Sequence, residues 1–315
     1  MARSEVDFSR FFEQRVGKPV RKSVLLRDHS NFRIGGPADF FAEVESLEAL
    51  RAALAAGRES GLRVRVIGGG SNLLFDDAGF RGLIIKNRVR GLRLDPGPRG
   101  GWRAVALSGT PLQELVEFCA SRSLEGLEFA AGIPGSVGGA VCGNAGAFGC
   151  CLGDFFEEAA LLSADGSERR EKRDYFAFAY RNSILKASGE VVLEAVFCLE
   201  TGDQAAIRAK IKENQALRSS RHPDRTMAYA GSFFKNPVGP EGSKIPAGML
   251  LEQVGAKEAA VGGAAVFRGH ANFIYNRGDA TAAEIRALAG ELKERVRAKF
   301  GLELEEEVVF LRAEP

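Results

Sequence analysis

Residues 129–153 carry the chemistry that is most readily inferred from residue types alone. No charged residue lies between Glu128 and Asp154, and the stretch contains eight glycines and one proline without helical or strand periodicity. Glycine adopts positive φ without strain and lets the main chain approach a bound group closely, but it makes a poor helix interior. Backbone N–H groups exposed in this way, with the side chains of Ser136 and Asn144, suit a large, flat, anionic cofactor. The alternative is a buried glycine-rich loop without a ligand.

A second glycine-rich turn, GGGSN at residues 68–72, directly follows a predicted strand. It is not the common dinucleotide-binding fingerprint, because Leu73 stands where G-x-G-x-x-G needs its third glycine. No phosphate-loop lysine follows either. The turn is therefore consistent with phosphate binding of another kind, and an ordinary tight turn explains it equally well.

Composition excludes several classes of function. The 315 residues carry a net charge of +2, with 45% hydrophobic and 27% charged residues, which is typical of a soluble protein of two or three domains. The small charge and the lack of a basic tract argue against nucleic acid. Five cysteines without metal-ligand spacing argue against zinc and iron–sulfur sites. Because the N-terminus lacks the apolar core of a secretory signal, we expect a cytoplasmic protein with reduced thiols, no metal and no membrane insertion.

Hydrophobic periodicity and turn signals place the glycine-rich segments among alternating strands and helices. We expect strands at 39–45, 63–67, 83–86, 103–108, 158–163, 191–199, 264–267, 272–275 and 302–311. We expect helices near the N-terminus, after Ser46, after a capping box at Thr110–Gln113, over 207–217, around 248–254, and after a capping box of Thr281 and Glu284. A strand, a helix, a strand and a glycine turn in succession are typical of an α/β nucleotide site. The pattern changes near residues 200–206, where we place the main domain boundary.

Six motifs lie in sequence order along nearly the whole chain. They are GGGSNLL (68–74), AGIPGSVGGAVCGNAGAFG (131–149), YRNS (180–183), GSFFKNP (231–237), HANFIYN (270–276) and EVVFL (307–311). Together they make the chain similar to the UDP-N-acetylenolpyruvoylglucosamine reductases. The resemblance implies an α+β protein with a vanillyl-alcohol-oxidase-like (PCMH-type) FAD-binding fold of two lobes and a C-terminal α+β substrate domain. We expect the lobes at 1–90 and 91–205 and the substrate domain at 206–315.

The resemblance also implies a reaction and its cofactors. The reaction is the NADPH-dependent reduction of UDP-N-acetylglucosamine enolpyruvate to UDP-N-acetylmuramate, a step in peptidoglycan precursor synthesis. We expect non-covalent FAD, because covalent attachment in this fold uses His or Cys and the first glycine turn has neither. The expected cofactor-binding residues are Gly68, Gly69, Gly70, Ser71, Asn72, Leu73, Gly132, Ile133, Pro134, Gly135, Ser136, Gly138, Gly139, Asn144, Ala145 and Gly146.

Hydride addition to the β-carbon of an enolpyruvyl group builds negative charge on the α-carbon and its carboxylate, so the site needs a cation and an acid. By resemblance, Arg181 is the carboxylate partner, since its planar fork stays charged, Ser232 is the proton donor, and Glu307 works with the enol intermediate. Without the resemblance, Arg181 is interpreted as a surface arginine, Ser232 as a turn residue and Glu307 as part of an acidic run. The implied substrate-binding residues are Tyr180, Lys235 and Asn236.

The chain departs from the usual family pattern in places. It has no tyrosine between Tyr180 and Tyr229, and Val309 stands where many relatives carry arginine, which indicates a shorter subtype without the tyrosine loop. We expect a monomer whose partners are the UDP-sugar and NADPH. Two other functions stay open: another flavin oxidoreductase of the same fold, such as a sugar or hydroxy-acid oxidase, and a non-catalytic nucleotide-sugar or flavin-binding module. The GSFFKNP and EVVFL motifs speak against the oxidase.

Overall fold

The structure is a computed structural model that describes residues 5–224 and 226–314. The chain forms two compact units from interleaved segments. Unit 1 contains the described residues of 1–22, 40–69 and 82–217, and unit 2 contains those of 23–39, 70–81 and 218–315. The expected FAD-binding lobes at 1–90 and 91–205 and the expected substrate domain at 206–315 stay a prediction.

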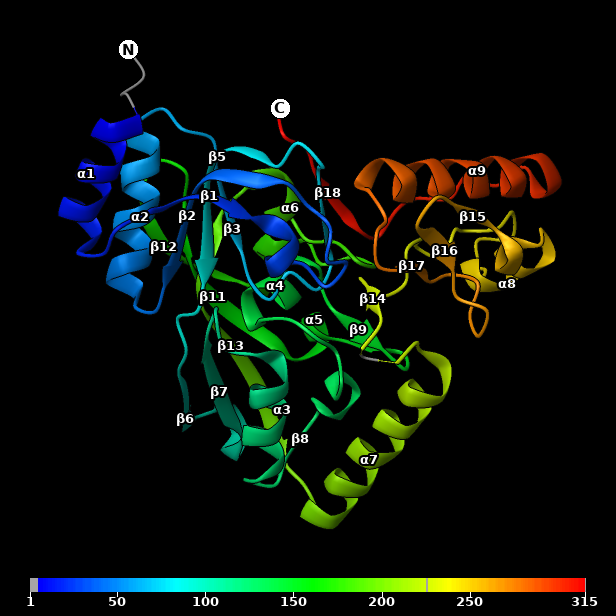
Figure 1. The fold of residues 1–315 in the computed structure, drawn as a ribbon. Helices are drawn as coiled ribbons and strands as arrows, with labels where there is room; N and C mark the ends of the chain where they lie inside the picture. The colour runs from blue at the N-terminus through cyan, green and yellow to red at the C-terminus, as the bar shows by residue number, and fades with distance from the viewer. Residues whose placement is uncertain (1–4, 225, 315) are drawn as a thin grey trace. The chain divides into compact units, whose positions relative to one another are not determined.

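A four-stranded sheet with the order β1-β2-β5-β3 begins the fold. Its strands are β1 (Arg21–Leu25), β2 (Pro37–Val44), β3 (Val64–Ile67) and β5 (Phe80–Asn87). Helices α1 (Glu5–Val16) and α2 (Leu47–Glu59) lie side by side against this sheet in Figure 1, and Phe8, Phe12 and Leu50 are buried there. The predicted cap of α2 is confirmed, since the Ser46 hydroxyl accepts the Ala49 N–H at 3.1 Å.

The second sheet of unit 1 is antiparallel and has the order β12-β11-β13-β7-β6, with β8 paired to β13. Its strands are β6 (Leu92–Pro96), β7 (Trp102–Leu107), β8 (Leu124–Glu125), β11 (Phe156–Leu162), β12 (Glu168–Lys172) and β13 (Val191–Thr201). The accompanying helices are α3 (Leu112–Ala120), α6 (Leu185–Ser188) and α7 (Gln204–Arg221).

The capping box expected at the start of α3 is wrong. Pro111 is the residue before the helix and has no capping side chain. The Thr110 hydroxyl instead bonds to the main chain of Gly91, and the side-chain oxygen of Gln113 accepts the Gly132 N–H at 2.8 Å. Gln113 therefore anchors the glycine-rich segment.

The glycine-rich segment is more regular than its sequence predicts. It contains α4 (Val137–Cys142), strands β9 (Gly146–Ala147) and β10 (Cys150–Cys151), and α5 (Leu152–Phe155). Ser136 begins α4, and its hydroxyl accepts the Gly139 N–H at 3.4 Å. A serine cap and burial of Val137 and Val141 stabilise a helix that two glycines and a short length disfavour.

Unit 2 combines a small antiparallel sheet, two helices and a parallel strand pair. The sheet order is β14-β17-β16-β15, with β14 (Ala228–Tyr229), β15 (Ala260–Val261), β16 (Ala264–Val266) and β17 (Ile274–Asn276). Its helices are α8 (Ala247–Gln253) and α9 (Ala282–Phe300), and the pair joins β4 (Leu73–Phe75) to β18 (Val309–Leu311). The capping box of Thr281 and Glu284 is confirmed, and Gly301 ends α9 with φ of 67°.

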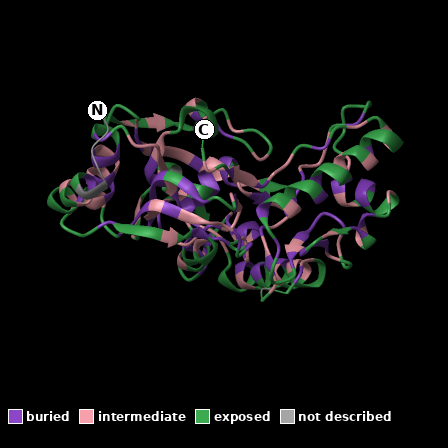
Figure 2. Cartoon of the chain, turned by 45° about the horizontal axis from the view of Figure 1, so that its top comes forward, coloured by how far each residue is buried: buried purple, intermediate pink, exposed green. Residues whose placement is uncertain are grey.

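The predicted strand at 302–311 is mostly wrong, because only residues 309–311 form β18. Across the described chain, buried residues lie along the strands and inner helix faces, while the outer helix faces are exposed (Figure 2). Within the described residues, no helix has both the length and the apolar character needed to cross a membrane.

Candidate active site

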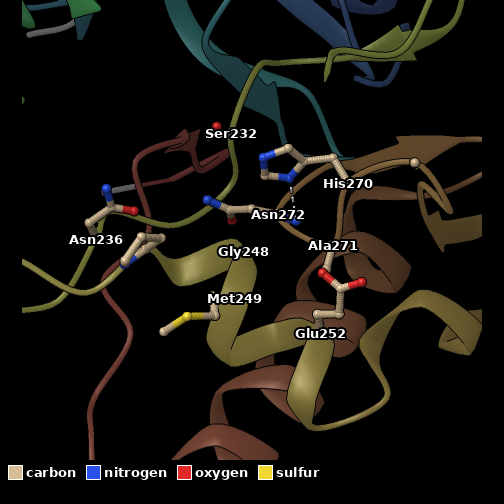
Figure 3. A pocket seen from close by; sticks show the side chains of 10 residues that line it. Ser232, Asn236, Gly248, Met249, Glu252, His270, Ala271 and Asn272 are labelled. Carbon is tan, nitrogen blue, oxygen red and sulfur yellow. Dashed lines mark hydrogen bonds between the residues drawn. The ribbon is translucent and has the colours of Figure 1, made fainter. Parts of the chain in front are cut away.

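A pocket of about 370 Å³ in unit 2 contains Ser232 in its wall. Figure 3 shows Ser232 and His270 on one side of this pocket, and Met249 and Glu252, which come from α8, on the other. The lining residues are Ser232, Asn236, Pro246, Gly248, Met249, Glu252, Gly269, His270, Ala271 and Asn272. Two of the predicted site residues, Ser232 and Asn236, therefore share one pocket.

The main chain after Ser232 is fixed by Asn272, which is buried. The Phe233 N–H donates to the Asn272 carbonyl oxygen at 2.8 Å. The Asn272 side chain accepts from the Phe234 N–H at 2.9 Å and donates to the Phe234 carbonyl oxygen at 2.8 Å. The GSFFKNP and HANFIYN motifs are thus joined by three hydrogen bonds that position Ser232.

Glu307 joins the same arrangement through its main chain. Its N–H donates to the Phe233 carbonyl oxygen at 2.8 Å, so Glu307 is bonded to the residue after Ser232. Its carbonyl oxygen accepts from the Asn72 side-chain amide at 2.9 Å. The sequence motifs at 68–74, 231–237 and 307–311 therefore meet within unit 2, and the side-chain contact of Asn72 was not predicted.

Lys235 and Asn236, the predicted substrate-binding residues of unit 2, already make contacts within the protein. The Lys235 ammonium pairs with the carboxylate of Glu305, which is largely exposed. The Asn236 side-chain oxygen accepts the Ala247 N–H at 2.9 Å, at the start of α8. Asn236 lines the pocket while it fixes the helix beside it.

His270 is a pocket residue to which the sequence assigned no role. Its Nδ1 accepts the Asn272 N–H at 3.2 Å, which places the proton of the neutral imidazole on Nε2 (Figure 3). Burial lowers the pKa of His270 and favours this neutral form. Gly248 packs against the ring, because a Cβ there would lie 2.8 Å from Cε1. The HANFIYN motif was the only signal in the sequence.

Arg181 lies in unit 1, at a two-residue hairpin turn closed by Ala179 and Asn182. Its φ of 55° is in the left-handed region, which is uncommon for residues other than glycine. Its Nη1 donates to the Gly146 carbonyl oxygen at 2.7 Å. Tyr180 is exposed at the same turn, with its ring centre 5.6 Å from the Arg181 Cζ.

Asn144 also joins the YRNS segment to the glycine-rich segment. Its side-chain amide donates to the Ala179 carbonyl oxygen at 3.0 Å, and its side-chain oxygen accepts the Gly153 N–H at 2.9 Å. The Ser183 hydroxyl donates to the Cys142 carbonyl oxygen at 2.8 Å. Asn144 was predicted to be a cofactor donor, whereas its buried amide bonds to the main chain of the protein.

The two glycine-rich segments lie against each other in unit 1. A Cβ on Gly68 would be 2.2 Å from the Ser136 hydroxyl oxygen, and one on Gly69 would be 3.4 Å from the Gly135 Cα. Gly68 is therefore required for this close approach. Gly135 has φ of 121°, which an L side chain rarely adopts.

The other predicted cofactor residues fall into three groups. Gly70, Ser71 and Leu73 belong to unit 2, where Leu73 begins β4. Ile133 and Pro134 precede α4 in unit 1, where Gly146 begins β9. Several backbone donors expected to face a cofactor are bonded within the protein; they belong to Gly132, Gly138, Gly139 and Ala145.

In the described part of the chain, no three His, Cys, Asp or Glu residues are grouped so that they could hold a metal ion.

Comparison with known proteins extends these observations. The family model described as "FAD binding domain" matches residues 38–171, and the model "UDP-N-acetylenolpyruvoylglucosamine reductase, C-terminal domain" matches residues 222–311. The UDP-N-acetylenolpyruvoylglucosamine reductase of Solibacter usitatus is 41% identical over 93% of this chain and 96% of its own length. The protein of the same name from Moorella thermoacetica is 42% identical over 90% of each chain.

The fold is similar to a solved structure as well. The crystal structure of UDP-N-acetylenolpyruvylglucosamine reductase from Thermus caldophilus superposes with a TM-score of 0.74. The two chains are 32% identical, and the match covers 92% of this chain and 99% of that one. The similarity therefore extends over most of both chains.

Proposed function

This chain belongs to the UDP-N-acetylenolpyruvoylglucosamine reductase family, and we propose that it uses NADPH to reduce UDP-N-acetylglucosamine enolpyruvate to UDP-N-acetylmuramate. It is an FAD-binding reductase of peptidoglycan precursor synthesis. The proposal includes a monomer and the shorter subtype, and the support for the subtype is that no tyrosine occurs between Tyr180 and Tyr229.

The observation that best supports this function is the arrangement around Phe233. Ser232 lines a pocket, and the main chain of Glu307 is bonded to the next residue. A hydroxyl and a carboxylate whose main chains are held together suit proton delivery to a carbon that becomes negatively charged. Neither an FAD-binding module without catalysis nor an oxidase needs this pair.

The glycine-rich segments fit the FAD that this family uses. The support is the approach of Gly68 to Ser136, which leaves no room for a side chain at residue 68. We assign the main chain of residues 68–73 and 132–136 to non-covalent FAD, with the segment up to Gly146 supporting it through hydrogen bonds inside the protein. When bound, FAD takes hydride from NADPH and supplies it to the β-carbon of the substrate.

Arg181 is assigned to the carboxylate of the enolpyruvyl group. Its guanidinium stays charged at all relevant pH values and has a planar fork that matches a carboxylate. Arg181 donates to a neutral acceptor, the Gly146 carbonyl oxygen, and a carboxylate of the substrate is a stronger acceptor because it is charged. Arg181 would thereby stabilise negative charge that develops during reduction.

Ser232 is assigned as the proton donor to the α-carbon, and Glu307 as the group that works with it on the enol intermediate. A serine hydroxyl is a weak acid, so a neighbouring group must make its proton transferable. Tyr180, Lys235 and Asn236 are assigned to the UDP-sugar. For Lys235, binding a diphosphate requires exchange of its exposed partner Glu305.

Absorbance spectroscopy of the purified full-length chain tests the function. We expect a bound-flavin spectrum that NADPH bleaches under anaerobic conditions and that UDP-N-acetylglucosamine enolpyruvate restores, with a product heavier by two hydrogen atoms. Restoration by oxygen alone, with the enolpyruvyl substrate inert, would favour an oxidase. A chain that binds flavin but is not reduced by NADPH would favour a binding module.

A further inference from the structure

The side chain of Asn72 is directed at Glu307. The side-chain Nδ2 of Asn72 donates to the Glu307 carbonyl oxygen at 2.9 Å. The main-chain carbonyl oxygen of Asn72 accepts the Val309 N–H at 3.0 Å. Asn72 therefore bonds to the main chain on both sides of Val308. Both partners belong to unit 2.

The opposite side of Glu307 is also bonded. The Glu307 N–H donates to the Phe233 carbonyl oxygen at 2.8 Å, and the Phe233 N–H donates to the Asn272 carbonyl oxygen at 2.8 Å. Glu307 precedes β18, so its N–H is held by an isolated hydrogen bond to Phe233 and not by a strand ladder. Replacing Asn72 by alanine would remove the hydrogen bond to the Glu307 carbonyl oxygen and would keep the bond from the Glu307 N–H to Phe233.

The position of Asn72 is itself fixed. Leu73, the next residue, begins β4 and pairs in parallel with Val309. Two residues before Asn72, Gly70 has φ of 69°, and a Cβ on Gly70 would lie 2.0 Å from the His29 carbonyl oxygen. Its carbonyl oxygen accepts the Asn31 N–H at 3.2 Å. The donor that reaches Glu307 therefore sits on a rigid turn rather than on a mobile loop.

We propose that Asn72 is a positioning residue for the Glu307 carboxylate, acting through the main chain of Glu307 and not as a side-chain ligand of the cofactor. The inference rests on the proposed function, in which Glu307 acts during substrate reduction. A small displacement of a reacting group lowers rate steeply, so one supporting hydrogen bond has a measurable kinetic effect. The effect is confined to the step in which the substrate is reduced.

A double-mutant cycle with Asn72→Ala and Glu307→Gln tests this proposal. FAD affinity, the rate of flavin reduction by NADPH, and the rate and pH profile of reoxidation by the enolpyruvyl substrate are measured at saturating FAD. We expect Asn72→Ala to slow reoxidation on the order of 5- to 10-fold, the size of one lost hydrogen bond, and to shift its pH profile. We expect FAD affinity and flavin reduction to stay within about twofold. On the Glu307→Gln background, Asn72→Ala should have no further effect.

A matched control is available in unit 1. The Asn214 side chain, which is buried, donates to the Glu128 carbonyl oxygen at 2.9 Å, the same type of bond to the same type of acceptor. We expect Asn214→Ala to lower the melting temperature without changing reoxidation. If Asn72→Ala does not fold, Asn72→Leu removes the donor while keeping the size of the side chain.

Three outcomes would overturn the proposal. Unchanged reoxidation in both Asn72 variants would show that the bond has no kinetic role. A parallel loss of FAD affinity and flavin reduction would make Asn72 a cofactor ligand. Additive effects of Asn72→Ala and Glu307→Gln would show that Asn72 acts on something else. Failure of the proposed function is a separate result, because Glu307→Gln alone would then leave reoxidation unchanged.

Discussion

Hydrogen bonds of the neighbouring main chain fix the position of Ser232. The next two N–H groups of the chain donate to Asn272, and the Phe233 carbonyl oxygen accepts from Glu307. Such bonds exist before any substrate arrives, so the hydroxyl needs little ordering when the reaction begins. Arg181 is likewise held in a left-handed conformation that its hairpin turn imposes.

His222 gives unit 2 a pH-dependent stability. Burial lowers the pKa of His222 to about 4, with smaller contributions from Arg218 and His270, and its ring lies 4.8 Å from that of Phe273. In the unfolded chain the pKa of this histidine is about 6.5. Between about pH 6.5 and pH 4, His222 therefore binds a proton in the unfolded state but not in the folded state. The free energy of unfolding therefore falls as the pH decreases through this range.

The measurement for His222 is thermal melting at pH 7 and pH 5. We expect the melting temperature of the wild type to fall more than that of His222→Gln, because the variant lacks the titrating ring. An equal fall in both proteins would mean that His222 does not contribute to the acid sensitivity.

At the scale of elements, the sequence predicted what depends on periodicity and local capping. The helix α9 was identified from its apolar face and from Thr281 and Glu284, since both signals lie within the element itself. The fold family and the pocket residues Ser232 and Asn236 came from the order of motifs.

Elements that depend on distant partners were not predicted. The helix α4 forms in a glycine-rich sequence because it is capped by Ser136 and packed in the core of unit 1. Residues 302–305 alternate in polarity as a strand does, yet residues 305–307 pair with the irregular segment 233–235 only through isolated bonds. The role of Asn72 depends on a contact 235 residues away in sequence, which no local pattern encodes.

The contact between the glycine turn and α4 gives a prediction at this scale. Gly68→Ala would place a Cβ 2.2 Å from the Ser136 hydroxyl oxygen and should lower the melting temperature of the flavin-free protein. Gly69→Ala should have a much smaller effect, because its nearest neighbour would be at 3.4 Å. Measuring flavin-free protein separates this packing effect from any effect on the cofactor.

A glycine within a helix gives a control in which alanine is expected to raise stability. Gly290 lies within α9 with nothing near its Cβ position, so Gly290→Ala should stabilise the protein by about 0.5–1 kcal/mol. Equal melting temperatures for Gly68→Ala and Gly69→Ala would contradict the proposed close approach of Gly68.

At the scale of the whole molecule, the units are not contiguous along the chain. Unit 2 takes residues 23–39 and 70–81 from the N-terminal part, and Phe32, Ile34 and Leu74 are buried in its core. The strand β4 also needs β18, which lies near the C-terminus. A cut at any single position therefore leaves one unit incomplete.

Truncation tests this interleaving. We expect a fragment of residues 1–217, which contains all of unit 1 but lacks most of unit 2, to expose Phe32, Ile34 and Leu74 and to bind a hydrophobic dye. The full-length chain serves as the reference. A soluble fragment that does not bind the dye would contradict the interleaved arrangement.

Rapid mixing of NADPH-reduced protein with UDP-N-acetylglucosamine enolpyruvate tests whether Ser232 supplies the proton. We expect Ser232→Ala to bind FAD and to be reduced by NADPH like the wild type. We expect the flavin absorbance of this variant to return roughly 100-fold more slowly or worse, as for a lost general acid. Return of the absorbance at the wild-type rate, with the same product formed, would show that Ser232 does not supply the proton.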